Sequence, residues 1–152
     1  MSDSAFLFDT NIWVALAFSA HPAHATARVA FAKASRSRPA CFCRATQQSF
    51  LRLLSTPAVL RAYGASAMTN DDALRVFDGF TAHPAVAFQE EPETISTLWP
   101  RAGKRATASP KVWMDVYLAA FALSGGLTMV TTDRDFGAFK SRGLDLILIE
   151  TA

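Results

Sequence analysis

The stretch FLFDTNIW, residues 6–13, decides how the chain is expected to fold at its start. Three apolar residues predict a short buried strand over 6–8, and TNIWVALAF (10–18) then has the composition of a helix. Asp9 stands at the junction of the two. An aspartate in this position can cap the helix, and it can also be one ligand of a metal site. The rest of the chain has to distinguish these roles.

Short strand-like runs and helical patterns alternate along all 152 residues. This alternation predicts an α/β fold in a single domain, 1–152, with a central, largely parallel sheet of four or five strands covered by helices on both faces. The expected strands are 6–8, 40–43, 85–88, 127–132 and 144–149. The expected helices are 10–18, 22–34, 45–55, 69–82, 92–99 and 110–124, with a loop or weak helix over 56–67.

Composition limits the class of protein. With 51% hydrophobic and 18% charged residues, the chain has the content of a compact domain and not of a disordered region. The formal net charge of +2 permits a polyanionic partner but identifies none. Two cysteines, Cys41 and Cys43, are expected to be buried free thiols in a reducing cytosol. Because no stretch has the features of a signal peptide or a membrane span, we expect a soluble cytoplasmic protein.

Three aspartates form the candidate site. Asp9 and Asp133 each follow a predicted strand, so both should reach the same edge of a parallel sheet, although either one alone is better explained as a helix cap. Asp115 changes this balance, because it lies in a helix that is almost wholly apolar over 112–123, where an ionised carboxylate is costly unless it is paired or bound to metal. Lys111 is its only local partner. Three carboxylates without cysteine suit Mg²⁺ or Mn²⁺ and phosphate chemistry.

Three motifs together carry a family resemblance: FLFDTNIWVAL (6–16), WMDVYLAAFAL (113–123) and LTMVTTDRDF (127–136). In this order and spacing the chain resembles the PIN-domain ribonucleases, in particular the VapC toxins of VapBC toxin-antitoxin pairs. The resemblance implies a three-layer α/β/α fold and metal-dependent cleavage of RNA by a water nucleophile. It implies catalytic, metal-coordinating roles for Asp9, Asp115 and Asp133. It also implies a small VapB-like antitoxin as partner and a homodimer.

The resemblance also implies supporting residues around the metal. Asn11 and Thr132 would be hydrogen-bonding groups near the site, and Asp135 is a weaker candidate that is equally explained as a solvated turn residue. One departure concerns the glutamate that the family usually carries in the third helix. Here Ser49 or Gln48 occupies its place and offers only a neutral oxygen, which predicts weaker metal binding or a single-metal site.

Basic and aromatic residues complete the expectations. Arg44 and Arg52 flank the helix that lacks the glutamate, and Lys104 and Arg105 lie in the basic loop 101–111 before the Asp115 helix. These four are the candidate RNA-binding residues, with a purely solvating role as the alternative. Tryptophans, Trp113 included, are most simply core. Leu16, Phe50 and Leu54 are candidates for an apolar groove or dimer surface.

Two other functions remain open. A degenerate PIN domain would bind RNA or a protein partner without cleavage, which the missing glutamate makes possible. A phosphatase of the haloacid dehalogenase type is the weaker alternative, because FLFDTNIW loosely matches its D-x-D-x-T motif but Asn11 stands where the second aspartate is needed. Metal-dependent cleavage that is lost in Asp9→Asn would distinguish the nuclease from both.

Overall fold

The computed structural model of the protein describes residues 3–151 and is built on one five-stranded sheet in the order β3-β2-β1-β4-β5. Every pairing in this sheet is parallel. The strands are β1 (Phe6–Phe8), β2 (Ala40–Phe42), β3 (Val86–Phe88), β4 (Thr128–Thr131) and β5 (Leu146–Leu148). The predicted α/β class and three-layer arrangement are therefore confirmed, and the sheet is wholly parallel.

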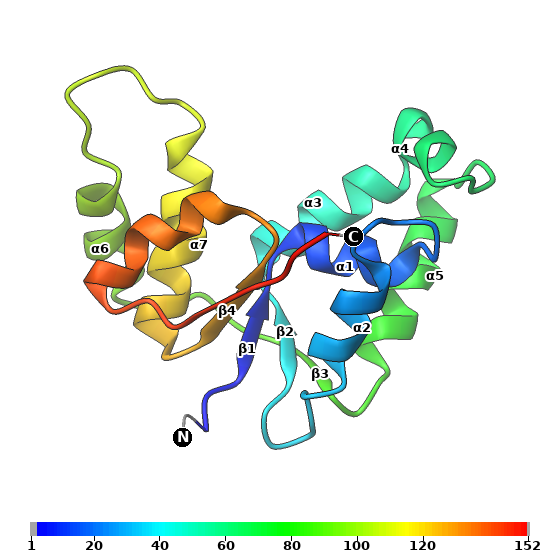
Figure 1. The fold of residues 1–152 in the computed structure, drawn as a ribbon, viewed down its shortest axis with the longest axis horizontal. Helices are drawn as coiled ribbons and strands as arrows, with labels where there is room; N and C mark the ends of the chain where they lie inside the picture. Colours follow the sequence, from blue (N-terminus) through cyan, green and yellow to red (C-terminus); the bar gives the residue numbers. More distant parts are fainter. Residues whose placement is uncertain (1–2, 152) are drawn as a thin grey trace.

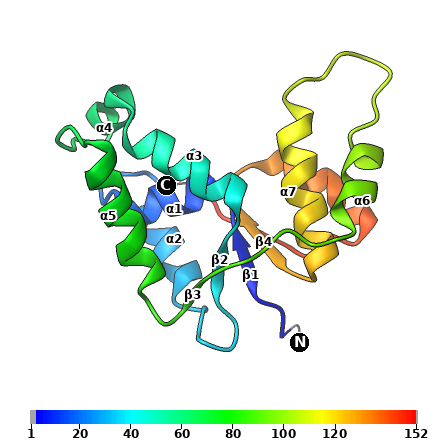
Figure 2. The ribbon, with the colours of Figure 1, turned by 180° about the vertical axis from the view of Figure 1, so that it is seen from behind.

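Helices cover both faces of the sheet (Figures 1 and 2). One side carries α1 (Thr10–Ala17), α2 (His24–Phe31), α3 (Arg44–Leu54), α4 (Pro57–Ala62) and α5 (Asn70–Thr81). The other side carries α6 (Ile95–Ala102), α7 (Val112–Gly125) and the 3-10 helix η1 (Arg134–Arg142). Two projections rise beyond the sheet, which we call the α3–α5 arm (residues 44–81) and the α6–α7 arm (residues 95–125).

Alternation along each strand divides the core into two clusters. Phe6 and Phe8 of β1 pack on the side of α1, α2, α3 and α5, whereas Leu7 packs on the side of α6, α7 and η1. The first cluster is rich in aromatic rings, with Trp13 stacked on Phe42 at 3.8 Å between ring centroids. The second combines the alanines of α7 with larger side chains, among them Phe121, Met129 and Phe136. Together the clusters fix the position of β1 at the centre of the sheet.

Some local predictions are confirmed in detail. Thr69 caps α5: its hydroxyl accepts a hydrogen bond from the Asp72 N–H at 3.1 Å, and the Asp72 carboxylate accepts one from the Thr69 N–H at 3.0 Å. Cys41 and Cys43 are buried free thiols, and burial raises the pKa of Cys41 to about 11. Within residues 3–151, no helix is both long and apolar enough to cross a membrane.

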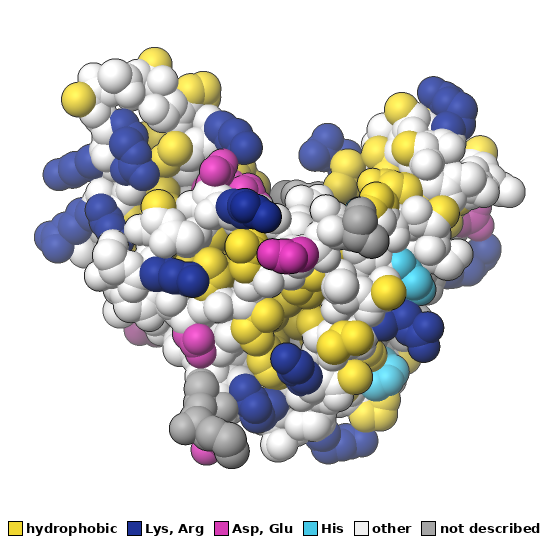
Figure 3. Space-filling model, viewed as in Figure 1, with side chains coloured by type: hydrophobic (Ala, Val, Ile, Leu, Met, Phe, Trp, Pro, Cys, Tyr) yellow, Lys and Arg dark blue, Asp and Glu magenta, His cyan; other side chains and the backbone are white. Residues whose placement is uncertain are grey.

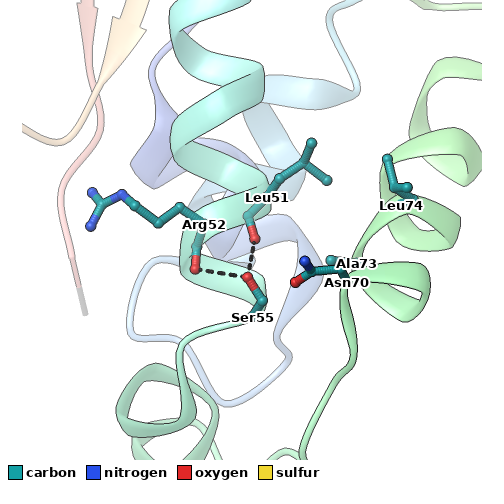
Figure 4. Close-up of a pocket in the computed structure, with 6 residues that line it drawn as sticks. All are labelled: Leu51, Arg52, Ser55, Asn70, Ala73 and Leu74. Atoms are coloured by element: carbon teal, nitrogen blue, oxygen red, sulfur yellow. Dashed lines mark hydrogen bonds between the residues drawn. The ribbon is translucent and has the colours of Figure 1, made fainter.

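Within 56–67, where the sequence left a loop or a weak helix open, residues 57–62 form the short helix α4, with Pro57 in its first turn, where a missing N–H costs nothing. Other predictions need correction. Phe50 and Leu54 are fully buried, so they cannot line a surface groove. Trp113, expected in the core, is 47% exposed at the start of α7. The surface groove next to α3 is instead lined from α3 and α5, with Leu51 and Leu74 pointing into the space between these helices (Figure 4).

Candidate metal centre

The carboxyl ends of β1 and β4 lie side by side at the centre of the sheet. From β1 the chain runs outward to β2 and β3, and it then returns to β4 and β5 on the other side of β1, so the strand order reverses between β1 and β4. The register pairs Phe8 with Val130, and the Asp9 N–H donates to the Val130 carbonyl at 2.9 Å. Such a reversal opens a crevice at the strand ends, where open α/β sheets place their ligands.

Of the two roles that the sequence left open for Asp9, the structure shows the helix cap. It is the N-cap of α1, and its Oδ1 accepts a hydrogen bond from the Thr10 N–H at 2.8 Å. Its other oxygen, Oδ2, accepts a hydrogen bond from the Thr131 hydroxyl at 2.7 Å. The side chain is only 8% exposed. Burial raises the pKa of Asp9 and outweighs these two hydrogen bonds, which lower it, while the charges of Asp133 and Asp115 raise it further.

Asp115, Asp133 and Asp135 bring their carboxylates together on the other side of this crevice. One oxygen atom of each lies within 4.8 Å of the corresponding atoms of the other two. Burial is the main cause that raises the pKa of Asp115, and the charges of Asp133 and Asp135 add to it, whereas Lys111 lowers it. Lys111 forms its ion pair with Asp135 at 3.8 Å rather than with Asp115. Lys111 therefore favours the ionised form of Asp115 without forming an ion pair with it.

One cavity of about 300 Å³ joins most of the predicted site. Its lining includes Asp9, Asn11, Ser49, Arg52, Lys111, Asp115 and Asp133. Acidic and basic side chains lie next to one another at the base of the hollow between the two arms (Figure 3). Asp135 lines the neighbouring cavity with Asp115, Lys111 and Arg105. The three predicted catalytic aspartates, which come from β1, α7 and β4, thus face one space.

The donors of this cavity fit a divalent cation. Carboxylate oxygens are the ligands that Mg²⁺ and Mn²⁺ prefer, and the lining includes neither cysteine nor histidine. Burial is the main cause of the raised pKa of Asp9 and of Asp115, and the charges of neighbouring carboxylates add to it. A bound cation would favour the ionised form of both groups. Asp9, Asp115 and Asp133 are the residues that would hold the ion.

Thr131 is a site residue that the sequence reasoning missed in favour of Thr132. The Thr131 side chain is fully buried and its hydroxyl binds two site residues: it donates to Asp9, and it accepts from the Asp133 N–H at 3.0 Å. Strand pairing could have identified it, because Phe8 and Val130 are partners and the next residues, Asp9 and Thr131, therefore lie opposite each other. Thr132 does not line the cavity.

One of the four predicted RNA-binding residues lies at the carboxylate cavity, and the other three lie elsewhere. Arg52 lines the carboxylate cavity, and its side chain leaves α3 on the side away from α5 (Figure 4). Arg44 instead packs its guanidinium over the Phe88 ring at 4.7 Å and hydrogen-bonds Gln47. Lys104 and Arg105 lie in the α6–α7 arm, where the Arg105 guanidinium donates to the carbonyls of Ala102 and Lys104. Only Arg52 of these four meets the three aspartates in one cavity.

Comparison with known proteins identifies the family to which this chain belongs. The family model described as PIN domain matches residues 6–141. Ribonuclease VapC41 of two Mycobacterium tuberculosis strains is 42% identical over 144 residues, covering 94% of this chain and 97% of the relative. The chain therefore belongs to the PIN-domain family, among its VapC ribonucleases, as the three motifs indicated.

Two solved structures share the fold at low sequence identity. The VapBC2 structure from Rickettsia felis, bound to a DNA fragment from its promoter, has a TM-score of 0.63 at 13% identity and covers 96% of this chain and 99% of that one. Mycobacterium tuberculosis VapC20, described as a sarcin-ricin loop cleaving toxin, has a TM-score of 0.59 at 16% identity and covers 88% of this chain and 94% of that one. These likenesses concern the fold.

Proposed function

We propose that this protein is a divalent-metal-dependent endoribonuclease toxin, which hydrolyses RNA phosphodiester bonds with an activated water. The observation that carries the proposal is the meeting of Asp9, Asp115 and Asp133 in one cavity, within a PIN domain that is 42% identical to a ribonuclease. Mg²⁺ or Mn²⁺ is the proposed ion. When bound, such an ion activates water and stabilises the leaving oxygen of a phosphodiester.

Other residues of the chain orient the carboxylates and the phosphate of the substrate. Thr131 and the Thr10 N–H hold both oxygens of Asp9 in place, so this carboxylate is oriented before any ion arrives. Asp115 and Asp133 approach the same space from α7 and β4. Arg52 and Lys111 line the cavity as cations and would orient the phosphate by charge-assisted hydrogen bonds. Asn11 and Ser49 add neutral polar groups, and Asp135 supports the site from the neighbouring cavity.

An antitoxin and a second copy of the chain are the proposed protein partners. The Rickettsia felis structure contains a toxin together with its antitoxin, and this chain has the fold of that structure over nearly its whole length. The groove between α3 and α5, with Leu74 45% exposed, is an apolar surface that supports a contact with another protein. A cytoplasmic location belongs to the same proposal, since RNA and a newly made antitoxin are encountered there.

The first experiment is cleavage of a mixed RNA pool by the purified protein with Mg²⁺ or Mn²⁺, beside an EDTA control and the Asp9→Asn variant. Cleavage that disappears in both controls is the expected result. The neutral Ser49 in place of a glutamate favours one other function, a domain that binds RNA without cutting it. Binding of RNA by the wild type with no cleavage under any metal condition would establish this alternative instead.

A further inference from the structure

Trp113 is a large exposed aromatic residue of the α6–α7 arm. It lies in the first turn of α7, two residues before Asp115, and 47% of its surface is accessible. Its neighbour Met114, 53% exposed, lines the carboxylate cavity. A tryptophan that keeps about half of its surface exposed offers a large aromatic face to a ligand.

The Trp113 ring is fixed before any ligand binds. Gly103 lies directly against it, since a Cβ atom built on Gly103 would come within 2.3 Å of the ring. Trp99 meets the ring edge to face, with 6.3 Å between ring centroids and an interplanar angle of 86°. The Trp99 indole N–H also donates to the Trp113 carbonyl at 3.1 Å. A rigid indole loses little conformational entropy when a flat ligand stacks on it.

Cations and hydroxyl groups surround this ring. Trp113 lines a cavity of about 310 Å³ together with Lys104, Arg105, Thr107 and Ser109, and none of the residues that line it is acidic. Basic side chains gather along the α6–α7 arm in the space-filling view (Figure 3). Arg105 also lines the cavity that contains Asp115, so this basic residue connects the Trp113 cavity with the carboxylates.

We propose that the Trp113 cavity binds one unpaired nucleobase of the RNA, stacked on the indole, with an adjacent phosphate held by Lys104 or Arg105. The inference rests on the proposed nuclease function. An aromatic ring beside cations is the combination that proteins use to bind single-stranded nucleic acid, because every base has a π face. The positive surroundings favour RNA over an apolar protein segment. The site would select for an unpaired nucleotide next to the cleaved bond.

The test measures RNA binding without cleavage. In the Asp9→Asn background with EDTA, the Kd of a labelled single-stranded RNA is measured by fluorescence anisotropy for the parent, Trp113→Phe, Trp113→Leu and, as a matched control, Val29→Ala. Val29 is an apolar residue of α2 that is 64% exposed. Trp113→Leu should raise the Kd about 5- to 150-fold, the range of one lost base stack. Trp113→Phe should retain most of the affinity, and Val29→Ala all of it.

A scan with RNAs that each lack one base then identifies the stacked nucleotide. One abasic position should weaken binding to the parent and have no further effect on Trp113→Leu. Equal Kd values for Trp113→Leu and the parent would overturn the proposal, and so would an abasic effect that persists in Trp113→Leu. Loss of self-association or antitoxin binding in Trp113→Leu, with RNA affinity unchanged, would assign the ring to a protein contact and also overturn it.

Two further measurements cover the case of an unfolded variant and the case in which the proposed function itself is wrong. If Trp113→Leu does not fold, photocrosslinking of the parent with 5-bromouridine RNA replaces it, and a crosslink mapped by mass spectrometry away from Trp113 contradicts the proposal. Cleavage by the wild type distinguishes failure of the base-binding proposal from failure of the proposed nuclease function. If the wild type cleaves RNA while Trp113→Leu binds normally, only the base site is wrong. If the wild type neither cleaves nor binds RNA, the proposed function itself fails.

Discussion

The two sides of the carboxylate cavity differ in charge. The side formed by α7 and the end of β4 presents two carboxylates, Asp115 and Asp133, with the single cation Lys111 at the start of α7, whereas the side formed by α3 presents Ser49 and Arg52 and no carboxylate. The acidic side is suited to a cation and the α3 side to the negative phosphate. The difference teaches that a neutral residue on α3, where the resemblance places the family's glutamate, has a consequence besides weaker metal binding. It leaves one side of the cavity free for the substrate.

The largest effect is expected on the acidic side. Asp115→Asn should lower the rate of RNA cleavage by at least about 100-fold, because it removes a charged metal ligand and with it the electrostatic stabilisation of the reaction. Single-turnover cleavage measures this directly. Asp71→Asn, in the exposed first turn of α5, is the matched control and should cleave as the wild type does. An unchanged rate in Asp115→Asn would remove this residue from the site.

The next effect is expected on the α3 side. Arg52→Ala should lower kcat/KM about 10- to 100-fold, the range for loss of a hydrogen bond to a charged group. Arg44→Ala is the control on the same helix, because the Arg44 guanidinium packs over Phe88 and not in the cavity. Equal effects of the two changes would show that both arginines act only through the general positive charge of the surface.

A smaller gain is expected when the missing charge is restored. Ser49→Glu should tighten Mn²⁺ binding about 10-fold, since it adds a fourth carboxylate to the cavity. Isothermal titration calorimetry measures the Kd. Gln48→Glu is the control, because Gln48 is exposed and does not line the cavity. A gain in Gln48→Glu and none in Ser49→Glu would place the family's glutamate position at residue 48.

The smallest effect concerns stability against pH in the absence of metal. Because the pKa of Asp9 is raised in the folded protein, the folded state holds a proton in a pH window where the unfolded chain has already released it. Stability from this group is therefore full below the ordinary pKa of about 3.9 and decreases as pH rises through the raised value. The Asp9→Asn variant has no ionisable group at this position, so its stability does not decrease in this way as the pH rises.

Thermal melts in EDTA test this expectation. The Tm of Asp9→Asn should exceed that of the wild type at neutral pH by a few degrees, and the difference should shrink toward pH 4. Added Mn²⁺ should raise the Tm of the wild type much more than that of the variant, because a ligand stabilises the state that binds it. A Tm difference that does not depend on pH would mean that Asp9 does not titrate in this range.

The sequence predicted the sheet and its acidic edge better than it predicted surfaces. Asp9 and Asp133 could be placed together because the carboxyl ends of parallel strands must meet at one edge. Trp113 could not be placed, because α7 is apolar on nearly every side and has no polar stripe that marks the exposed face. Thr131 required knowledge of which strands are neighbours. Phe50 and Leu54 were expected at a surface because apolar spacing on a helix does not distinguish a groove from the core.

The hydrogen bond between Asp9 and Thr131 joins residues that are 122 positions apart in the chain. On the ribosome, Asp9 is made before Thr131, and synthesis of the 122-residue interval takes roughly 6 to 24 s at ordinary elongation rates. During that time the neighbour of β1 on the β4 side is missing, so the cavity cannot form. The carboxylate site of this fold is therefore incomplete on the ribosome until β4 has been made and has paired with β1.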